Sequence, residues 1–380
     1  MKICAIICEY NPFHNGHLYQ LEQARASGAD AVLCIMSGNF VQRGEAAVMD
    51  KYTRAKHAVM AGADIVIELP TVFATSNAEI FAKGAIKLLS SIPAVTSLCF
   101  GAETDDAEAF LSAAKQLNNE PAEISGKIKQ NLSVGMSFAK ARAEAWSQLI
   151  PQELLSSPNN ILGLEYAKAI VAYNANIRLL PILRIGSGYN TMELKENYSS
   201  ASAIRQAIKN KEKTGSNLPD YVKNDLPNEL ENKLVVLEKY AVISKNATNL
   251  TKVCDCNEGL ENAFKNATLS PLSFPESLTS ARYTASRIRR IALQNLLNIE
   301  ENFIRECLCS SLYLHVLATK KSRKDVLTAL SESSLPLLVR AHDEDVLTDT
   351  AKACHAKDIF AEAVYSLLYP NNRIKKTIFV

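Results

Sequence analysis

The 380-residue sequence contains no apolar run of about 18 residues, the length that a helix needs to cross a bilayer, so we expect no membrane-spanning segment. It also lacks the charged start, apolar core and cleavage site of a signal peptide, because Met1–Cys4 leads directly into a strand-like run. The nine cysteines are an odd number, and several lie in apolar runs: Cys4, Cys8, Cys34 and Cys99. These features predict a cytoplasmic protein with reduced thiols.

The spacing of a zinc site is missing as well. Cys254 and Cys256 are separated by one residue, as are Cys307 and Cys309, and neither pair has a companion pair at zinc-site spacing. We therefore predict no metal held by protein side chains alone. Positive and negative charges nearly balance, with a net charge of +2, so any surface that binds nucleic acid must be a local patch.

Strand and helix signals alternate through the first half of the chain. Short, continuously apolar runs predict buried parallel strands over Ile3–Cys8, Ala31–Met36, Asp64–Pro70, Val95–Phe100 and Leu179–Ile185. Helical periodicity separates them from Gly16 onward, and it covers Tyr52–Ala61, Asn77–Leu89 and an amphipathic insertion over Asp105–Trp146. This alternation predicts an α/β fold, a Rossmann-like parallel sheet wrapped by helices.

The character of the sequence changes after about Ile208. Lys209–Ser216 is a polar linker, and beyond it convincing buried strands disappear. Helical periodicity covers Arg287–Ile299, Asn302–Ala318 and Asp325–Ser331. We therefore predict two domains, a sheet domain over residues 1–208 and a mostly α-helical domain over residues 209–380.

His14–His17, with the sequence His-Asn-Gly-His, is the most informative stretch. It follows the first strand and a turn, so free N–H groups and the positive end of a helix dipole face the crevice in which parallel sheets bind ligands. The two imidazoles share a helix face and can donate hydrogen bonds to phosphate oxygens, while Gly16 lets a base or ribose approach the backbone. Zinc binding and a purely structural helix cap are the alternatives, although the Glu of a His-Glu-x-x-His zinc site is absent.

A second motif, Tyr198–Arg205, follows the fifth predicted strand. Its serines can cap a helix and bind phosphate, and Arg205 lies one turn in, where its guanidinium can hold a triphosphate. The alternative is an ordinary N-cap followed by a surface arginine. Together with His-x-Gly-His, the motif resembles the nucleotidyltransferase superfamily, in which the two motifs embrace the phosphates of ATP.

A closer resemblance extends over most of the chain. It is carried, in order, by Glu9–His17, Met36–Glu45, Ile67–Pro70, Phe100–Glu103, Pro158–Gly163 and Thr279–Tyr283. These stretches resemble the bacterial tRNA(Met) cytidine acetate ligase family. The resemblance implies an enzyme that activates acetate with ATP as acetyl-adenylate and acetylates N4 of the wobble cytidine of elongator tRNA(Met), giving N4-acetylcytidine. It implies ATP and acetate binding in residues 1–208 and tRNA binding in residues 209–380.

The resemblance also assigns the ATP site. His14 and His17 are expected to be catalytic by stabilising phosphate charge, with magnesium assisting. The residues expected to bind ATP are Ile7, Cys8, Glu9, Tyr10, Asn11, Pro12, Phe13, His14, Asn15, Gly16, His17, Leu18, Tyr19, Gln20, Gly101, Asn159, Asn160, Arg184, Ile185, Ser200, Ser202 and Arg205.

Several of these assignments leave alternatives open. Gly101 ends the fourth predicted strand, where a side chain would block the adenosine. Either Asn159 or Asn160 can meet ATP, and the pair can instead cap the following helix. Arg184 interrupts an apolar stretch, which suits a nucleotide contact or a structural ion pair.

The acetate site is expected at the end of the second strand, because a small, hydrogen-bonding pocket suits a two-carbon acid. The residues expected to face the same crevice there are Ser37, Gly38 and Asn39. Arg43 can meet pyrophosphate or RNA. Asp64 and Glu68 flank the third strand and can hold magnesium, although a solvated or capping carboxylate is the simpler interpretation.

Basic residues cluster in the predicted helical domain. No acidic residue occurs from Ser277 to Leu297, and the basic group there comprises Arg282, Arg287, Arg289 and Arg290, with Tyr283 among them. Two further clusters are Lys320, Lys321, Arg323 and Lys324, and Arg373, Lys375 and Lys376. One such cluster is typical of a solvated face, but three beside an ATP site predict a surface that follows the tRNA backbone.

Two other functions use the same motifs. A small-molecule adenylyltransferase of cofactor biosynthesis would need neither the helical domain nor the basic clusters, so tRNA binding separates it from a tRNA-modifying enzyme. A non-catalytic RNA-binding protein would not need an intact His-x-Gly-His motif, and acetate-dependent exchange of pyrophosphate into ATP separates that alternative. No feature of the sequence indicates an oligomeric state.

Overall fold

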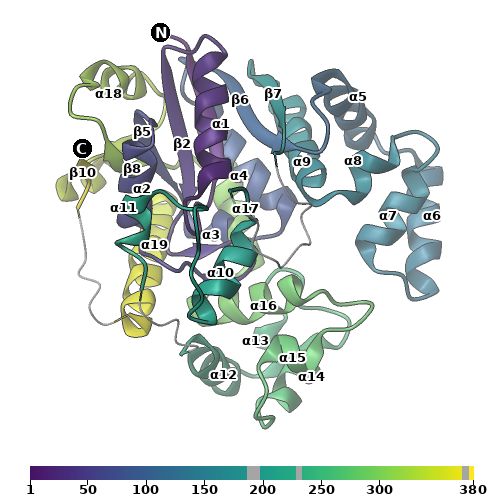
Figure 1. Ribbon diagram of the computed structural model, residues 1–380. Coiled ribbons are helices and arrows are strands. Elements are labelled where there is room, and N and C mark those ends of the chain that lie inside the picture. Colours follow the sequence, from purple (N-terminus) through teal and green to yellow (C-terminus); the bar gives the residue numbers. More distant parts are fainter. Residues whose placement is uncertain (186–196, 228–232, 370–375) are drawn as a thin grey trace.

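The computed structural model describes residues 1–185, 197–227, 233–369 and 376–380 (Figure 1). In these residues one sheet dominates, with the strand order β10-β8-β5-β2-β1-β6-β7 and β9 beside β8. Its strands are β1 (Ile3–Cys8), β2 (Ala31–Ser37), β5 (Ile65–Leu69), β6 (Val95–Ala102), β7 (Arg178–Leu183), β8 (Leu314–Thr319), β9 (Leu337–Leu338) and β10 (Ile378–Phe379). A separate antiparallel hairpin joins β3 (Phe40–Val41) and β4 (Glu45–Ala46).

The five strands from the first half of the chain are parallel, which confirms the predicted sheet. β1 lies between β2 and β6, so the strand order reverses at β1. In sheets of this kind, ligands bind beyond the carboxyl ends of the strands at that reversal. The topology therefore places the expected site next to Cys8, the last residue of β1.

Both faces of the sheet are buried, as continuously apolar strands require. Cys4, Ile6 and Cys8 of β1 share a core with α1 (Asn15–Ala26) and α2 (Lys51–Met60). The alternate residues of β1 pack on the other face against α3 (Thr71–Ala74), α4 (Ala78–Ser90) and α9 (Pro158–Ala172). The helical insertion predicted over Asp105–Trp146 consists of α5 (Ala107–Asn118), α6 (Ala122–Ser133) and α7 (Phe138–Trp146), and the short α8 (Gln152–Ser156) follows it.

A small helical unit with its own core lies below the sheet in Figure 1. It contains α12 (Leu234–Ser244), α13 (Ala247–Leu250), α14 (Leu260–Ala267), α15 (Phe274–Leu278) and α16 (Ala285–Leu297). Helix α16 joins this unit to the sheet, because Ile288 and Ile291 belong to the small core whereas Leu293 and Leu297 belong to a core of the sheet. The remaining helices are α10 (Ala201–Lys209), α11 (Asp220–Lys223), α17 (Glu301–Cys309), α18 (Lys324–Ser331), the 3-10 turn Ala341–Val346 and α19 (Asp349–Leu368).

The helix predicted over Asn302–Ala318 is wrong in its second half. Helix α17 ends at Cys309, and β8 then enters the sheet antiparallel to β5, with Thr319 opposite Ile65. A short apolar run such as Leu314–Thr319 has no periodicity that distinguishes a strand from a helix. It forms a strand because it pairs with the edge of β5. Because β8, β9 and β10 complete the sheet, the division at residues 208 and 209 stays a prediction.

None of the helices in the described ranges combines the length and the apolar character needed to cross a membrane.

Candidate active site

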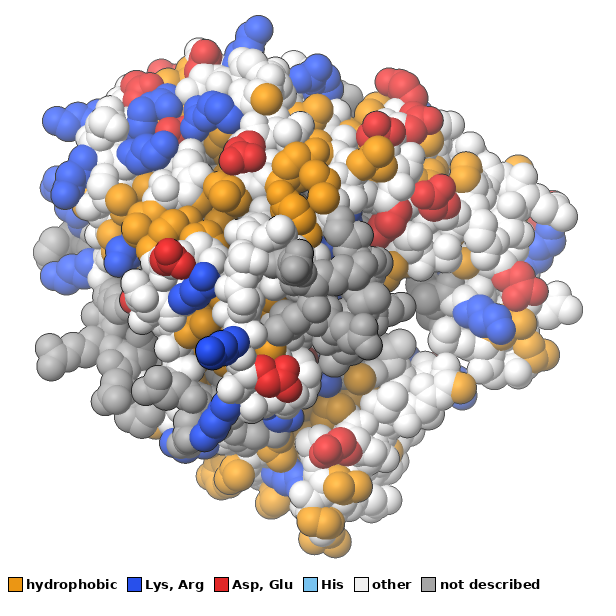
Figure 2. Space-filling view, viewed as in Figure 1, with side chains coloured by type: hydrophobic (Ala, Val, Ile, Leu, Met, Phe, Trp, Pro, Cys, Tyr) orange, Lys and Arg blue, Asp and Glu red, His pale blue; other side chains and the backbone are white. Residues whose placement is uncertain are grey.

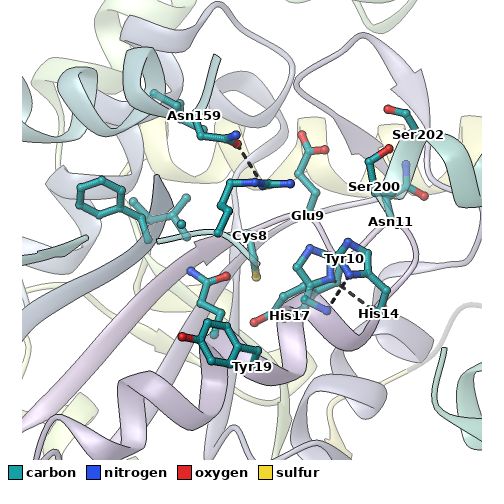
Figure 3. A pocket seen from close by; sticks show the side chains of 18 of the residues that line it. Cys8, Glu9, Tyr10, Asn11, His14, His17, Tyr19, Asn159, Ser200 and Ser202 are labelled. Carbon is teal, nitrogen blue, oxygen red and sulfur yellow. Dashed lines mark hydrogen bonds between the residues drawn. The ribbon is translucent and has the colours of Figure 1, made fainter. Parts of the chain in front are cut away.

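A pocket opens beyond the carboxyl ends of β1 and β6, at the reversal of strand order (Figure 3). Its walls come from the turn after β1, the start of α1, the hairpin, the start of α9, the end of β7 and the start of α10. The two predicted motifs, nearly 200 residues apart in the sequence, therefore meet at one pocket. Each of the two helices, α1 and α10, directs its N-terminus to it, which suits an anionic ligand.

His14 and His17 both cap helix α1 and line the pocket. Nδ1 of His14 accepts a hydrogen bond from the backbone N–H of Gly16 at 3.1 Å, and Nδ1 of His17 accepts one from the N–H of His14 at 3.3 Å. The rings stack with their centroids 3.7 Å apart. Since Nδ1 accepts in both rings, each neutral imidazole carries its proton on Nε2 and can donate it to a ligand. The structural cap and the ligand contact, which we weighed as alternatives, thus coexist.

The two imidazoles are neutral donors at physiological pH. Burial lowers the pKa of His14 to about 3, and the positive charges of Arg184 and Arg205 add to this effect. Burial also lowers the pKa of His17 well below its ordinary value, with His14 contributing next. The pair can therefore stabilise negative charge that develops on a phosphate by donating hydrogen bonds from neutral rings, without the positive charge of an imidazolium.

Helix α10 forms the opposite wall. Oγ of Ser200 accepts a hydrogen bond from the N–H of Ala203 at 3.1 Å, which starts the helix. Arg205, one turn later, donates a hydrogen bond to the carbonyl of Asn11 at 2.9 Å. This bond connects the second motif to the turn after β1. Ser202 lies beside Arg205. Three polar side chains from the N-cap and first turns of this helix line the pocket: Ser200, Ser202 and Arg205.

The side chain of Asn11 has a hydrogen-bond donor without a partner among the described residues. Its Oδ1 accepts a hydrogen bond from the N–H of Val48 at 2.8 Å, which orients the amide. Its Nδ2 is buried and has no hydrogen-bond partner among the described residues. Buried donors are nearly always paired in folded proteins, so this amide is a candidate donor to a bound molecule.

Of the two asparagines at the start of α9, Asn159 lines the pocket and Asn160 does not. Oδ1 of Asn159 accepts a hydrogen bond from Arg184 at 3.3 Å inside the pocket, as Figure 3 shows. Asn160 is fully buried behind it, and its Oδ1 accepts from the N–H of Glu103 at 2.8 Å. A Cβ at Gly101 would lie 3.4 Å from Cγ of Arg184, so the arginine stem covers this glycine.

Most of the predicted ATP-binding residues line the pocket. Those that do not are Pro12, Phe13, Asn15, Leu18 and Asn160. The prediction missed lining residues from the hairpin, from α4 and from the core: Gln42, Phe81, Phe100, Leu162, Tyr166, Ile182, Leu183, Tyr198, Ser199 and Ala201. Arg43, left open between pyrophosphate and RNA, also lines it. The missed residues Phe81, Phe100 and Tyr166 follow the core pattern of α4, β6 and α9, so no local signal separates them from the core.

The sequence profile of the HIGH Nucleotidyl Transferase family matches residues 1–378. The chain belongs to this family. It is 38% identical over 398 residues to the tRNA(Met) cytidine acetate ligase of Thermoanaerobacter sp. (strain X514), covering 100% of this chain and 98% of that protein. The enzyme of the same name from Clostridium novyi (strain NT) is 38% identical over 391 residues, covering 97% and 96%.

Solved structures agree with this family membership. The apo crystal structure of Thermotoga maritima TmcAL superposes with a TM-score of 0.91 at 30% identity, covering 100% of both chains. The same protein bound with alpha-thio ATP gives a TM-score of 0.88 at 30% identity and the same coverage. The resemblance inferred from the motifs is therefore confirmed.

For this HIGH nucleotidyl transferase, the prediction that the acetate-site residues face the crevice is wrong. Ser37, Gly38 and Asn39 do not line the pocket, because they are buried behind it. Arg54 holds the carbonyls of Ser37 and Gly38, and Oδ1 of Asn39 accepts from the N–H of Lys51 at 2.7 Å. The polar groups of this loop bind Lys51 and Arg54 of α2 and so connect β2 to α2. No local pattern in the sequence predicts these contacts.

The two candidate magnesium carboxylates are neutralised by basic partners. Glu68 is buried, 2.9 Å from Nζ of Lys51 and 2.7 Å from Nδ1 of His315. Asp64 lies at the opposite edge of the sheet and pairs with Arg25, Lys320 and Arg323. The interpretation as solvated or capping groups is therefore wrong for both. Within the described ranges, no three His, Cys, Asp or Glu side chains gather as metal ligands.

The predicted tRNA-binding arginines are paired with acidic residues from elsewhere in the chain. Arg289 lies 3.1 Å from Glu45 of the hairpin, and Arg282 lies 3.0 Å from Glu258. Arg287 donates to the carbonyl of Asp255 at 2.8 Å, and Arg290 lies 3.9 Å from the carboxylate of Asp255. Arg287 and Arg290 thus stabilise the loop before α14, whereas Arg282 and Arg289 are more exposed, at 48% and 34% of their side chains.

The basic clusters do not form one surface. Lys320 and Arg323 lie at the amino edge of the parallel strands with Asp64, and Lys321 and Lys324 are exposed beside them. Figure 2 shows basic side chains over this corner, where Figure 1 places α18, far from the pocket. Of the third cluster, residues 373–375 lie outside the described residues.

Proposed function

We infer that this protein is an ATP-dependent tRNA(Met) cytidine acetate ligase. The observation that carries the proposal is the pocket built from both nucleotide motifs, in a chain similar over its whole length to proteins of that name and to T. maritima TmcAL bound with alpha-thio ATP. The product we propose is N4-acetylcytidine at the wobble position of elongator tRNA(Met). Because tRNA is the acceptor, we place the activity in the cytoplasm.

The first half-reaction needs stabilisation of phosphate charge. An acetate oxygen attacks the α-phosphorus of ATP, the bond to the β-phosphate oxygen breaks, and pyrophosphate leaves from acetyl-adenylate. The Nε2–H groups of His14 and His17 are placed to donate to the phosphate oxygens as charge develops. Ser200, Ser202 and Arg205 supply hydroxyl and guanidinium donors to the leaving pyrophosphate.

The adenosine side is assigned to the wall formed by Gly101, Asn159 and Arg184. For acetate, the unpartnered Nδ2 of Asn11 is the donor that the structure offers inside the pocket, in place of Ser37, Gly38 and Asn39. Magnesium would neutralise phosphate charge when bound with ATP. Phosphate oxygens and water suit its ligand shell, which commonly includes few protein groups.

For tRNA, we propose the pocket-side surface of α16 and its neighbouring loop, with Arg282 and Arg289 as contacts. These side chains are partly exposed, and α16 packs on the hairpin that supplies Gln42 and Arg43 to the pocket. We accordingly propose residues 1–208 for ATP and acetate and the helical part of residues 209–380 for tRNA.

The function is tested by incubating the protein with ATP, labelled acetate and total tRNA, then analysing the nucleosides. We expect labelled N4-acetylcytidine in tRNA(Met) and acetate-dependent exchange of pyrophosphate into ATP. Exchange without tRNA acetylation would indicate a small-molecule adenylyltransferase. Absence of exchange, with tRNA bound, would indicate a non-catalytic RNA-binding protein.

A further inference from the structure

Glu9 is the one carboxylate among the described residues that line the pocket. Three arginines line the same pocket: Arg43, Arg184 and Arg205. A site that binds ATP and acetate, both anions, gains no affinity from a negative side chain. A carboxylate in such a position therefore needs another explanation than ligand binding.

Glu9 is held firmly in place. A buried guanidinium, that of Arg54, donates to its backbone carbonyl. Its Oε1 accepts a hydrogen bond from the backbone N–H of Gln42 at 2.8 Å. Oε2 forms no hydrogen bond with the described residues, and Figure 3 shows the carboxylate among the side chains of the pocket.

The other titratable groups of the pocket are unsuited to accept a proton. His14 and His17 use Nδ1 to cap α1, so the nitrogen that each presents to the ligand already carries hydrogen. Burial raises the pKa of the Cys8 thiol and of the Tyr166 hydroxyl well above their ordinary values, so both stay protonated. Among the histidine, cysteine and carboxylate side chains of the described residues that line the pocket, Glu9 is the one with lone pairs available to accept a proton.

The surroundings also strengthen Glu9 as a base. Burial raises the pKa of Glu9 above its ordinary value. The hydrogen bond from Gln42 and the charges of Arg205 and Arg43 lower it in part, while Glu45 adds to the rise. A carboxylate whose pKa moves toward the working pH is a more effective proton acceptor.

We propose that Glu9 is the general base of acetyl transfer, taking the proton from the exocyclic amine of cytidine. This inference rests on the proposed function. The N4 lone pair attacks the carbonyl carbon of acetyl-adenylate, and a carbon–nitrogen bond forms. The bond from that carbon to the phosphate oxygen breaks, and its electron pair leaves with AMP. One N4 proton passes to the Glu9 carboxylate, which later releases it to water.

General-base help is needed because the amine of cytosine is a weak nucleophile, its lone pair being delocalised into the ring. Hydroxylamine, by contrast, is a strong nucleophile that attacks an acyl-adenylate unaided and gives acetohydroxamate. The two acceptors therefore distinguish loss of the base from loss of acetyl-adenylate. Glu9→Gln keeps the size of the side chain and an oxygen that can accept from Gln42.

The test compares wild type, Glu9→Gln and the control Glu22→Gln, which changes an exposed glutamate of α1. For Glu9→Gln we expect pyrophosphate exchange and acetohydroxamate formation to fall far less than acetyl transfer. Single-turnover transfer to saturating tRNA should fall by about 10² to 10⁴. The acidic limb of the pH profile for transfer should also disappear. The control should behave as wild type.

Two results would overturn the inference. Equal losses in exchange, hydroxamate formation and transfer would mean that Glu9 supports ATP binding or the fold. Transfer that remains near wild type, with its pH profile unchanged, would mean that another group takes the proton. If wild type itself shows no acetate-dependent exchange, the proposed function fails, and the role of Glu9 in acetyl transfer fails with it.

Discussion

His14 and His17 each cap helix α1 with one ring nitrogen, and we propose a chemical role for the other nitrogen. Nδ1 completes the start of α1, and Nε2 faces the pocket as a donor. Substitution by alanine removes both tasks together, so the two roles are separable only with side chains that keep the cap. Glutamine at the third helical position and asparagine at the N-cap do this.

We expect His17→Gln to fold normally and to lose activity. A glutamine oxygen can still accept from the N–H of His14, so the melting temperature should stay near that of wild type. Loss of one donor to the developing phosphate charge should lower acetate-dependent pyrophosphate exchange by about 10² to 10³. His17→Ala should lose similar activity and, in addition, about 1 kcal/mol of stability. Near-native exchange by His17→Gln would refute the phosphate role.

His14 should also make stability depend on pH. Its pKa is about 3 in the folded protein against an ordinary 6.5, so between these values the unfolded chain binds a proton that the folded protein excludes. The free energy of unfolding therefore falls as the pH drops below about 6.5, by about 1.4 kcal/mol per pH unit from this group. In urea titrations at several pH values, the free energy of unfolding of His14→Asn should change less steeply with pH than that of wild type, by about 1.4 kcal/mol per pH unit. Identical slopes would contradict the buried, neutral imidazole.

The hairpin of β3 and β4 is the element that connects the pocket to the helical unit. Gln42 and Arg43 at its tip line the pocket, while Glu45 lies 3.1 Å from Arg289 of α16 and 3.8 Å from Arg205 of α10. Gly44 lies against the backbone of α16, where an added Cβ would come within 2.6 Å of main-chain atoms of Arg289 and Arg290. Movement of α16 on binding RNA would therefore reach the ATP site through this hairpin.

Gly44→Ala tests this contact. Gly44 has φ +73°, and Gly28 has φ +83° with nothing within 4 Å of an added Cβ, so Gly28→Ala is a matched control for backbone strain. We expect Gly28→Ala to cost about 1 to 2 kcal/mol from the left-handed backbone alone. Gly44→Ala should cost about 2 kcal/mol more because α16 must shift, and it should also weaken ATP binding. Equal costs in chemical denaturation would show that the contact is loose.

At the scale of the whole molecule, the sheet separates two kinds of basic residue. Lys320 and Arg323 surround buried Asp64 at the amino edge, where they fix β8 to the start of β5. Arg289 of α16 pairs with Glu45 of the hairpin at the pocket, and Arg282 lies in the loop just before α16, where it pairs with Glu258. Because the carboxyl edge carries the pocket, a substrate RNA must approach from that side.

Two double variants with the same change of net charge test this arrangement. Arg282→Ala with Arg289→Ala should weaken tRNA binding and flatten its salt dependence by roughly one unit of log–log slope per lost contact. Lys320→Ala with Arg323→Ala should leave tRNA binding unchanged but reduce stability by about 3 kcal/mol, because Asp64 keeps its buried charge with fewer partners. Equal effects of both pairs on tRNA binding would place the RNA surface elsewhere.

The sequence by itself determined the parallel sheet, the helix starts at both nucleotide motifs and most of one wall of the pocket. These features depend on local patterns: apolar runs, a residue that caps a helix, and a motif contiguous with its strand. Only the tertiary structure decided that Asn159 rather than Asn160 meets the pocket, that Ser37 lies behind it, and that β8 is a strand. It also paired arginines of α16 with acidic residues far away in the sequence, Arg287 with Glu258, Arg290 with Asp255 and Arg289 with Glu45. The reason is that burial and charge pairing depend on residues far apart in the chain, whose approach no local pattern encodes.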